Sequence, residues 1–208
     1  MNRWAQAAFA LLAVLLVSTT IFRRASDCQN TPIKQGLNLL DPQPTDVAVP
    51  DLRLPSIDGR LVQLAEKLEQ PILLNIWATW CGPCIQELPQ LLAFAQALRG
   101  RVQVWLVSVD ESFDAIRNLA SELTQAEVNQ PHIGLAAVGQ MLQGKEPNVL
   151  ILLDASENAA NQFGTYKYPE SFWINSTGRV RAKFIGPKPW GNPVAIEYLS
   201  NAGFLPGS

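Results

Sequence analysis

Two cysteines three positions apart are the residues of this chain whose type and spacing could do chemistry. Cys81 and Cys84 enclose Gly-Pro and come directly after an apolar run over residues 71–77. If that run is a buried strand and a helix begins after it, both thiols lie on the first helical turn and can close a disulfide there. A helix N-terminus carries about +0.5 charge and free N–H donors, which stabilise a thiolate. This predicts Cys81 as the nucleophile and the better shielded Cys84 as the resolving thiol.

The two residues between the cysteines fit this interpretation. Gly82 lets the backbone of a partner approach, and Pro83 is tolerated in a first turn because its missing N–H would be unpaired anyway. Two other interpretations are a structural disulfide and half of a zinc site. A disulfide across so short a loop adds little stability by the loop-entropy argument. A zinc site needs a second ligand pair, and the only other cysteine and the only histidine are Cys28 and His132.

Composition bounds the remaining classes of function. The chain has 208 residues, 48% of them hydrophobic, with a net charge of -2, so one globular domain plus additional segments is expected. A nucleic-acid partner is not predicted, because such proteins carry a basic patch and a basic overall balance. No Walker loop and no GxGxxG occurs in the sequence, so no nucleotide cofactor is predicted either.

Strand and helix patterns alternate along the chain. Apolar runs predict buried strands at 71–77, 102–109 and 148–153, and helical periodicity predicts helices at 82–98, 112–125, 155–163 and 193–202. Asp58-Gly59 predicts a short hairpin between 52–54 and 60–64, and a second hairpin is expected over 171–175 and 179–185. Residues 126–147 are ambiguous, with a short helix expected around 135–142. The pattern predicts an α/β fold, a mixed central sheet flanked by helices and preceded by a short hairpin.

The N-terminus differs in character from the rest. Residues Trp4–Phe22 are apolar and uncharged, with Arg3 before them and Arg23-Arg24 after them. At about 1.5 Å per residue the stretch nearly spans a hydrocarbon core of about 30 Å, which predicts a transmembrane anchor over residues 1–23. A cleaved signal peptide is the alternative, although no small-x-small site precedes Arg23. Residues 24–49 contain three prolines, with Pro50 directly after them, and are interpreted as a tether, which leaves 50–208 as the folded domain.

Two separated motifs resemble one family. Trp77-Ala-Thr-Trp80-Cys81-Gly-Pro-Cys84 followed by Ile-Gln-Glu87-Leu-Pro89 resembles the WCxPCxxExP pattern of the membrane-anchored TlpA/ResA/DsbE-like branch of the thioredoxin family. That branch includes the extracytoplasmic reductases of cytochrome c maturation. The stretch Gly164-Thr-Tyr-Lys-Tyr168-Pro169-Glu170-Ser-Phe-Trp-Ile-Asn175 resembles the family's GVYGxPETFxID segment. The resemblance runs from about Val49 to Leu199.

The resemblance implies a thioredoxin-like fold and thiol–disulfide oxidoreductase activity. It implies no metal and no cofactor beyond the Cys81–Cys84 disulfide. The partners it implies are protein disulfides, a membrane electron donor and the membrane itself through the N-terminal helix. The redox domain is then expected outside the cytoplasm, on the periplasmic side in a Gram-negative cell. Gly-Pro between the cysteines favours the reducing direction.

The resemblance also implies roles for single residues. The Tyr168–Pro169 peptide bond is expected to be cis and to present the Tyr168 backbone to an extended substrate beside Cys81. Glu87 is expected to tune thiol protonation, since a partly buried carboxylate with a raised pKa can relay a proton. Glu170 is a second candidate proton group or substrate contact, and Trp80 is expected to flank the active-site surface. Asn75 takes the strand position where cytosolic thioredoxins have a buried aspartate, so no acid is available there.

Two other functions use the same scaffold. A partner-binding or chaperone module could use the cis-proline groove without redox chemistry, and it would retain activity with both cysteines replaced by serine. A peroxiredoxin-type peroxidase needs a Pro-x-x-x-Thr-x-x-Cys setting, which does not occur in the sequence. For Cys28 a free thiol, an intermolecular disulfide and no role at all stay open.

Overall fold

A six-stranded mixed sheet forms the centre of the computed structural model, which describes residues 32–64, 68–129 and 134–205. Its strand order is β1-β8-β7-β4-β5-β6, and β2 and β3 form a separate antiparallel hairpin. The strands are β1 (Gln43–Ala48), β2 (Arg53–Pro55), β3 (Leu61–Gln63), β4 (Ile72–Trp77), β5 (Gln103–Ser108), β6 (Val149–Leu153), β7 (Glu170–Ile174) and β8 (Arg179–Ile185). The helices are α2 (Pro32–Leu40), α3 (Gly82–Ala97), α4 (Phe113–Asn129), α5 (Leu135–Leu142), α6 (Asn158–Gln162) and α7 (Pro193–Asn201).

Strand β4 is the middle of the sheet and leads directly into the cysteine motif. It pairs in parallel with β5 and antiparallel with β7, and all six of its residues are buried. A strand covered on both faces reads as a continuous apolar run, because neither set of alternating side chains meets water. That is why residues 72–77 carry one polar side chain, Asn75, which lies on the face that α3 covers.

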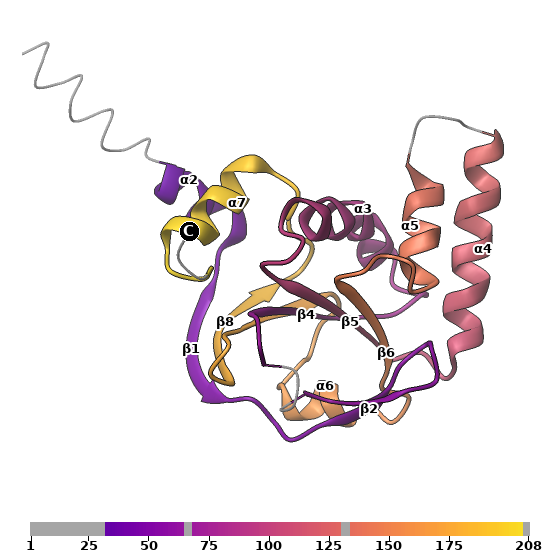
Figure 1. The fold of residues 1–208 in the computed structure, drawn as a ribbon, viewed down its shortest axis with the longest axis horizontal. Helices are drawn as coiled ribbons and strands as arrows, with labels where there is room; N and C mark the ends of the chain where they lie inside the picture. Colours follow the sequence, from indigo (N-terminus) through magenta and orange to yellow (C-terminus); the bar gives the residue numbers. More distant parts are fainter. Residues whose placement is uncertain (1–31, 65–67, 130–133, 206–208) are drawn as a thin grey trace, which may run out of the picture.

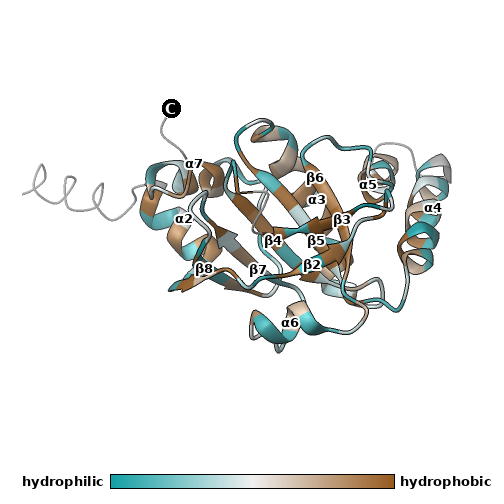
Figure 2. Cartoon of the chain, turned by 60° about the horizontal axis from the view of Figure 1, so that its bottom comes forward, coloured by the Kyte–Doolittle hydropathy of each residue, from teal (hydrophilic) through white to brown (hydrophobic). Residues whose placement is uncertain are grey.

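The helices are divided between the two faces of the sheet. Figure 1 shows α3, α5 and α7 above the sheet, while α6 and the strand β2 lie below it. In Figure 2 the strands at the centre are brown, and teal residues gather on the outer sides of α2, α4 and α6. Burial of apolar side chains between the two helical layers and the sheet stabilises this arrangement.

Most predicted elements are confirmed, including the fold class. The central strands, the β2–β3 hairpin, the β7–β8 hairpin, α5 and α7 lie within a few residues of their predicted bounds. Helix α4 is longer than predicted and continues to Asn129. Helix α4 packs against α5. A Cβ at Gly139 would lie 2.6 Å from the carbonyl oxygen of Ala120, so the backbones of the two helices are in close contact.

The segment predicted as a tether differs from that prediction over residues 32–48. These residues form α2, which packs on α7, and β1, which extends the sheet along β8. A Cβ at Gly36 would lie 2.1 Å from the Tyr198 Cβ, so only glycine permits this approach of the two helices. Asp46 accepts from Arg179 and Arg181 and fastens β1 to the sheet. The prolines of this segment suggested a tether, but an edge strand such as β1 tolerates proline.

The predicted membrane span, Trp4–Phe22, lies outside the described residues, as do Cys28 and His132. Among the helices that the structure describes, none combines the length and the apolar character needed to cross a bilayer.

Candidate active site

The two cysteines lie at the start of α3 and form a disulfide. Their Cα atoms are 5.2 Å apart, and Cys81 is the N-cap residue of the helix. The Cys81 sulfur accepts from the Cys84 backbone N–H at 3.3 Å, which is where a side-chain oxygen would lie in an ordinary N-cap. Both cysteines are buried by their neighbours, Cys84 to 1% exposure. The Cys84 backbone N–H of the first turn therefore points at the Cys81 sulfur, an arrangement that stabilises a thiolate.

A buried carboxylate holds the loop that precedes Cys81. Asp110 follows β5 at the end of the sheet where β4 also ends, and it accepts from the Thr79 backbone N–H at 3.0 Å and from the Thr79 hydroxyl at 2.7 Å. The Ser108 hydroxyl donates to the same carboxylate at 2.5 Å. These bonds fix the turn between β4 and α3. Gly82 and Pro83 are both exposed beside the disulfide, and the space around Gly82 is open.

Glu87 lies one turn beyond Cys84 on the buried side of α3, with 2% of its surface exposed. One carboxylate oxygen accepts from the Lys188 backbone N–H at 2.8 Å and from the Trp190 indole N–H at 2.7 Å. The other accepts from the Asn75 side-chain amide at 3.0 Å. The amide of Asn75 also donates to Ser171 at 2.8 Å, so Glu87 is connected to two strands and to the loop after β8.

Burial raises the pKa of Glu87 to about 7. Loss of hydration disfavours the charged form, and the three hydrogen-bond donors offset only part of this cost. Asn75, Trp190 and the Lys188 backbone are uncharged as donors, and the charge of the Lys188 side chain lowers the pKa of Glu87 by too little to return it to its usual range. Glu87 can therefore change its protonation state near neutral pH, which is the property a proton relay needs.

Aromatic side chains border the disulfide on the side of Pro169. The Tyr168–Pro169 bond is cis, as predicted. The ring of Trp80, 67% exposed, meets the ring of Tyr168 edge to face at 5.7 Å between centroids. The Tyr168 hydroxyl donates to Glu157 at 3.2 Å. The residue before Cys81 and the residue before Pro169 are thus brought together, although they are far apart in the sequence.

Glu170 lies on the opposite face of the sheet from Glu87. Its neighbour Ser171 points towards Asn75, and side chains alternate along a strand, so Glu170 points towards the α6 side. Its side chain is fully buried, and the Lys183 ammonium lies 2.8 Å from its carboxylate. Lys183, whose side chain is partly exposed, lies against the buried Glu170 carboxylate.

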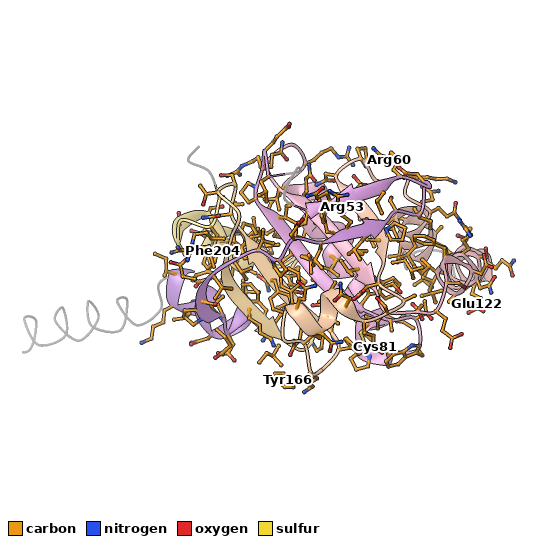
Figure 3. All side chains as sticks on the ribbon, turned by 90° about the horizontal axis from the view of Figure 1, so that it is seen from below. Arg53, Arg60, Cys81, Glu122, Tyr166 and Phe204 are labelled. Carbon is orange, nitrogen blue, oxygen red and sulfur yellow. A yellow bond between two sulfur atoms is a disulfide. The ribbon has the colours of Figure 1, made fainter. Side chains whose placement is uncertain are left out.

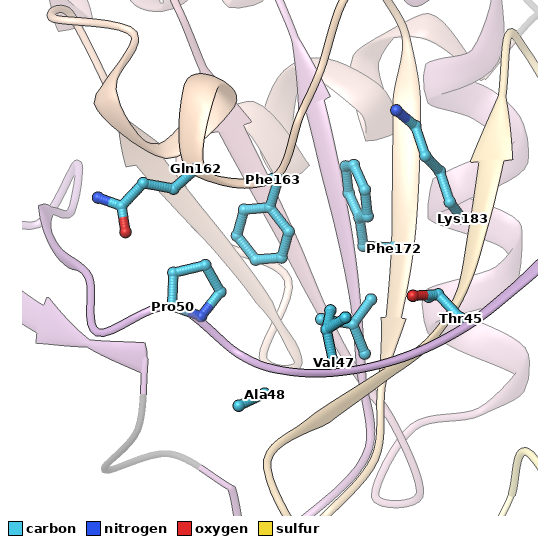
Figure 4. Close-up of a pocket in the computed structure, with 9 residues that line it drawn as sticks. Thr45, Val47, Ala48, Pro50, Gln162, Phe163, Phe172 and Lys183 are labelled. Carbon is cyan, nitrogen blue, oxygen red and sulfur yellow. The ribbon is translucent and has the colours of Figure 1, made fainter.

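A small cavity of about 130 Å³ lies between β1 and α6, away from the cysteines. Figure 4 shows its wall of Phe163, Phe172, Val47 and Pro50, with the stem of Lys183 at one side. The four side chains of this wall are apolar and contain no reactive group. Within the described part of the chain, no group of three or more His, Cys, Asp or Glu side chains is placed to hold a metal ion.

The structure brings most of the predicted site together. Cys81, Cys84 and Glu87 share α3, and Trp80 contacts Tyr168 beside the cis Pro169. Sequence reasoning missed the Trp190 indole and the Lys188 backbone, which both bond Glu87, and it missed Asp110, which bonds Thr79 in the loop before Cys81. For Asp110 a signal existed, because it follows a parallel strand that ends at the same edge of the sheet as β4. No comparable signal points to Trp190.

The fold and the disulfide at the start of α3 define a thioredoxin-fold protein with a Cys-Gly-Pro-Cys site. The sequence model of the Redoxin family matches residues 44–199, and the chain belongs to that family. The match includes the cysteine motif, the cis proline and both hairpins of the described structure.

Curated relatives and solved structures agree with this assignment. The thiol:disulfide interchange protein DsbE of Pseudomonas fluorescens is 28% identical over 72% of this chain and 72% of its own. The thiol-disulfide oxidoreductase ResA of Geobacillus thermodenitrificans is 24% identical over 66% of this chain and 67% of its own. A solved thiol-disulfide oxidoreductase from Bacteroides fragilis has a TM-score of 0.53 and 16% identity, covering 75% of this chain and 99% of its own, which shows the same fold.

Proposed function

We propose that this protein is a thiol–disulfide oxidoreductase that reduces disulfides of exported proteins. The observation that carries the proposal is the Cys81–Cys84 disulfide at the N-terminus of α3, next to a buried Glu87 and beside Trp80 and Tyr168. The relatives named above are thiol–disulfide oxidoreductases, which supports the same activity here.

The reaction starts from the reduced pair. The Cys81 thiolate attacks one sulfur of a substrate disulfide; that S–S bond breaks, and the other substrate sulfur leaves as a thiolate that takes a proton from water. A mixed disulfide now joins Cys81 to the substrate. The Cys84 thiolate attacks the Cys81 sulfur and releases the second substrate thiolate, which is also protonated. Two electrons pass to the substrate, and Cys81–Cys84 becomes oxidised.

Glu87 is the proposed base for the second step. The Cys84 thiol must lose its proton before it can attack, and Glu87 on the same helix, with a pKa raised to about 7, can take that proton near neutral pH. Trp80, Gly82, Pro83, Tyr168 and Pro169 form the proposed substrate surface. Glu170 belongs to that surface only indirectly, because its carboxylate is buried under Lys183.

The place of the protein in the cell is also a proposal. The resemblance of the two motifs to the membrane-anchored branch of the family and the apolar Trp4–Phe22 stretch support a membrane-anchored protein with its redox domain outside the cytoplasm, re-reduced by a membrane dithiol donor. Apocytochrome c is the proposed class of substrate within cytochrome c maturation.

Trapping tests the reaction. In Cys84→Ser the mixed disulfide cannot be resolved, so substrates should accumulate on Cys81 when this variant is expressed in its own cell. Cys81→Ser is the matched control and should trap nothing. If Cys84→Ser captures no protein, and the variant lacking both cysteines keeps its biological activity, the chain is a binding module instead.

Labelling tests the location. A membrane-impermeant maleimide added to intact spheroplasts after mild reduction should label Cys81, with Cys28→Ser used throughout to remove the third thiol. Labelling that requires lysis would place the domain in the cytoplasm and reject the cytochrome-maturation proposal.

A further inference from the structure

Two exposed aromatic rings stand at the edge of the molecule that carries the disulfide. Among the described residues, the large apolar side chains that stay exposed include only two aromatic ones, Trp80 and Tyr166, and Tyr166 is 73% exposed. Figure 3 shows Tyr166 and Cys81 along the same edge, opposite Arg60. Tyr166 is two residues before Tyr168, whose ring contacts Trp80. Single exposed apolar side chains are common on protein surfaces, so the case for Tyr166 rests on its place on this edge and on the contacts that hold its ring.

The ring of Tyr166 is held in place although it is exposed. The Lys183 ammonium lies 4.6 Å from the Tyr166 ring centroid, within the range of a cation–π contact. The same ammonium donates to the Gly164 carbonyl at 2.8 Å. Lys183 therefore holds the segment 164–166 at two points. Further along, Tyr168 is held by Trp80 and by Glu157.

Lys183 is itself held by residues of strand β7. Its ammonium is 2.8 Å from the Glu170 carboxylate, and Glu170 is fully buried in β7. The Phe172 ring lies 5.5 Å from the same ammonium, on the residue that pairs with Lys183 across β7 and β8. Neither Glu170 carboxylate oxygen makes a hydrogen bond among the described residues, so the Lys183 ammonium is its polar contact, and the pair connects the sheet to the loop before Pro169.

We infer that Tyr166 is a substrate-contact residue that selects disulfides flanked by apolar or aromatic side chains, and that Glu170 and Lys183 are positioning residues for its ring. This inference rests on the proposed oxidoreductase function. One face of the ring is occupied by the Lys183 ammonium, and the exposed remainder is available to stack on a side chain beside the substrate cysteine. A ring that is ordered before binding loses little entropy when the substrate docks.

The inference gives Glu170 a different role from that of Glu87. Glu170 contacts no substrate and moves no proton in this scheme. It keeps Lys183 under Tyr166, and Tyr166 contacts the polypeptide. Replacement of the ion pair should therefore change which substrates react, without changing the chemistry of the cysteines.

The test compares two disulfide peptides and one small disulfide. The peptides are identical except that Leu and Phe flank the cysteine in one and Ser flanks it in the other, and the linear bis(2-hydroxyethyl) disulfide is the small disulfide. Wild-type reduced protein should prefer the Leu/Phe peptide. Tyr166→Ala should lower kcat/KM for that peptide about tenfold, as the loss of an aromatic contact residue typically does. It should leave the rates with the Ser peptide and with bis(2-hydroxyethyl) disulfide unchanged within about twofold.

The positioning role is tested by Glu170→Gln combined with Lys183→Met, which removes both charges and avoids a lone buried carboxylate. This variant should lose the same preference as Tyr166→Ala, and adding Tyr166→Ala to it should cause no further loss. Tyr166→Phe should behave as wild type. Leu61→Ala is the control for an exposed apolar residue elsewhere, since Leu61 is 65% exposed on β3 next to Arg60.

Each outcome is decisive. A preference that survives in Tyr166→Ala, or an equal fall with all three disulfides, would overturn the inference about Tyr166. Additive losses in the triple variant would show that Lys183 does not act through Tyr166. If the wild-type protein reduces none of the three disulfides, the proposed function fails first, and the two failures are thereby distinguished.

Discussion

Two buried glutamates lie on opposite faces of the same sheet, and they differ in the groups that contact their carboxylates. Glu87 on α3 accepts from three uncharged donors, the Asn75 amide, the Trp190 indole and the Lys188 backbone N–H. Glu170 on β7 faces a charged partner, the Lys183 ammonium, at 2.8 Å. Both side chains are almost completely removed from water.

The difference shows what a buried carboxylate can be used for. Without a cation in contact, burial raises the pKa of Glu87 to about 7, and the group can exchange protons beside the cysteines. With an ammonium in contact, Glu170 serves as an anchor that fixes Lys183 and, through it, the loop of Tyr166. Four variants break or sharpen this comparison.

The largest effect is expected from Lys183→Met alone. It leaves the Glu170 carboxylate buried without its cation, and breaking such a pair costs about 3–5 kcal/mol of unfolding free energy. Chemical denaturation of the oxidised protein measures this. Glu170→Gln combined with Lys183→Met should recover most of the loss; if the combined variant is as unstable as Lys183→Met, packing of the Lys183 stem is responsible.

Glu87→Gln should change how stability depends on pH. The pKa of Glu87 is raised in the folded state, so the stabilising contribution of its protonated form is complete below about pH 4.5 and is lost as the pH rises through about 7. Glutamine does not titrate. The unfolding free energy of the wild type should therefore fall by about 3 kcal/mol relative to that of Glu87→Gln between pH 4.5 and pH 8. Unfolding of the oxidised protein measures this without thiol titration, and parallel curves would contradict it.

The same variant should slow the resolving step. If Glu87 takes the Cys84 proton, Glu87→Gln should lower the single-turnover rate of release from the mixed disulfide about a hundredfold at pH 7, the low end of general-base contributions. The Asn75 side-chain carbonyl has no hydrogen-bond partner among the described residues, so the Asn75 amide can rotate to accept from the introduced glutamine amide and preserve the fold. The combined Glu170 and Lys183 variant, tested with bis(2-hydroxyethyl) disulfide, should leave this rate unchanged. An unchanged rate in Glu87→Gln would make Glu87 a structural group.

The smallest effect is expected from Trp190→Phe. The indole N–H favours the charged form of Glu87. Its loss should raise the pKa of Glu87 further, by about one unit, and shift the pH–rate profile to higher pH. Trp173→Phe is the matched control, because the Trp173 indole N–H finds no acceptor in the part of the chain that the structure describes. Equal shifts in both variants would point to repacking of the aromatic cluster.

The sequence predicted the elements that carry the chemistry because their signals are local. The apolar run of β4, the cysteine spacing at the start of α3 and each hairpin turn are patterns contained within a few consecutive residues. It failed over residues 32–48, where α2 and β1 depend on partners near the C-terminus. The close approach of Gly36 to Tyr198 and the bonds from Asp46 to Arg179 have no local signal.

The sequence by itself determined that Cys81 and Cys84 share a helical turn, since spacing and the preceding strand suffice for that. Tertiary structure decided how the two glutamates behave. Both follow motif residues closely, and local pattern does not distinguish them: Glu87 lies on the buried side of α3, and Glu170 opens a strand covered on both faces. The fold brings Trp190 to one and Lys183 to the other. The pKa of a buried carboxylate depends on hydration and on which groups touch it, and those contacts exist only once distant segments have packed.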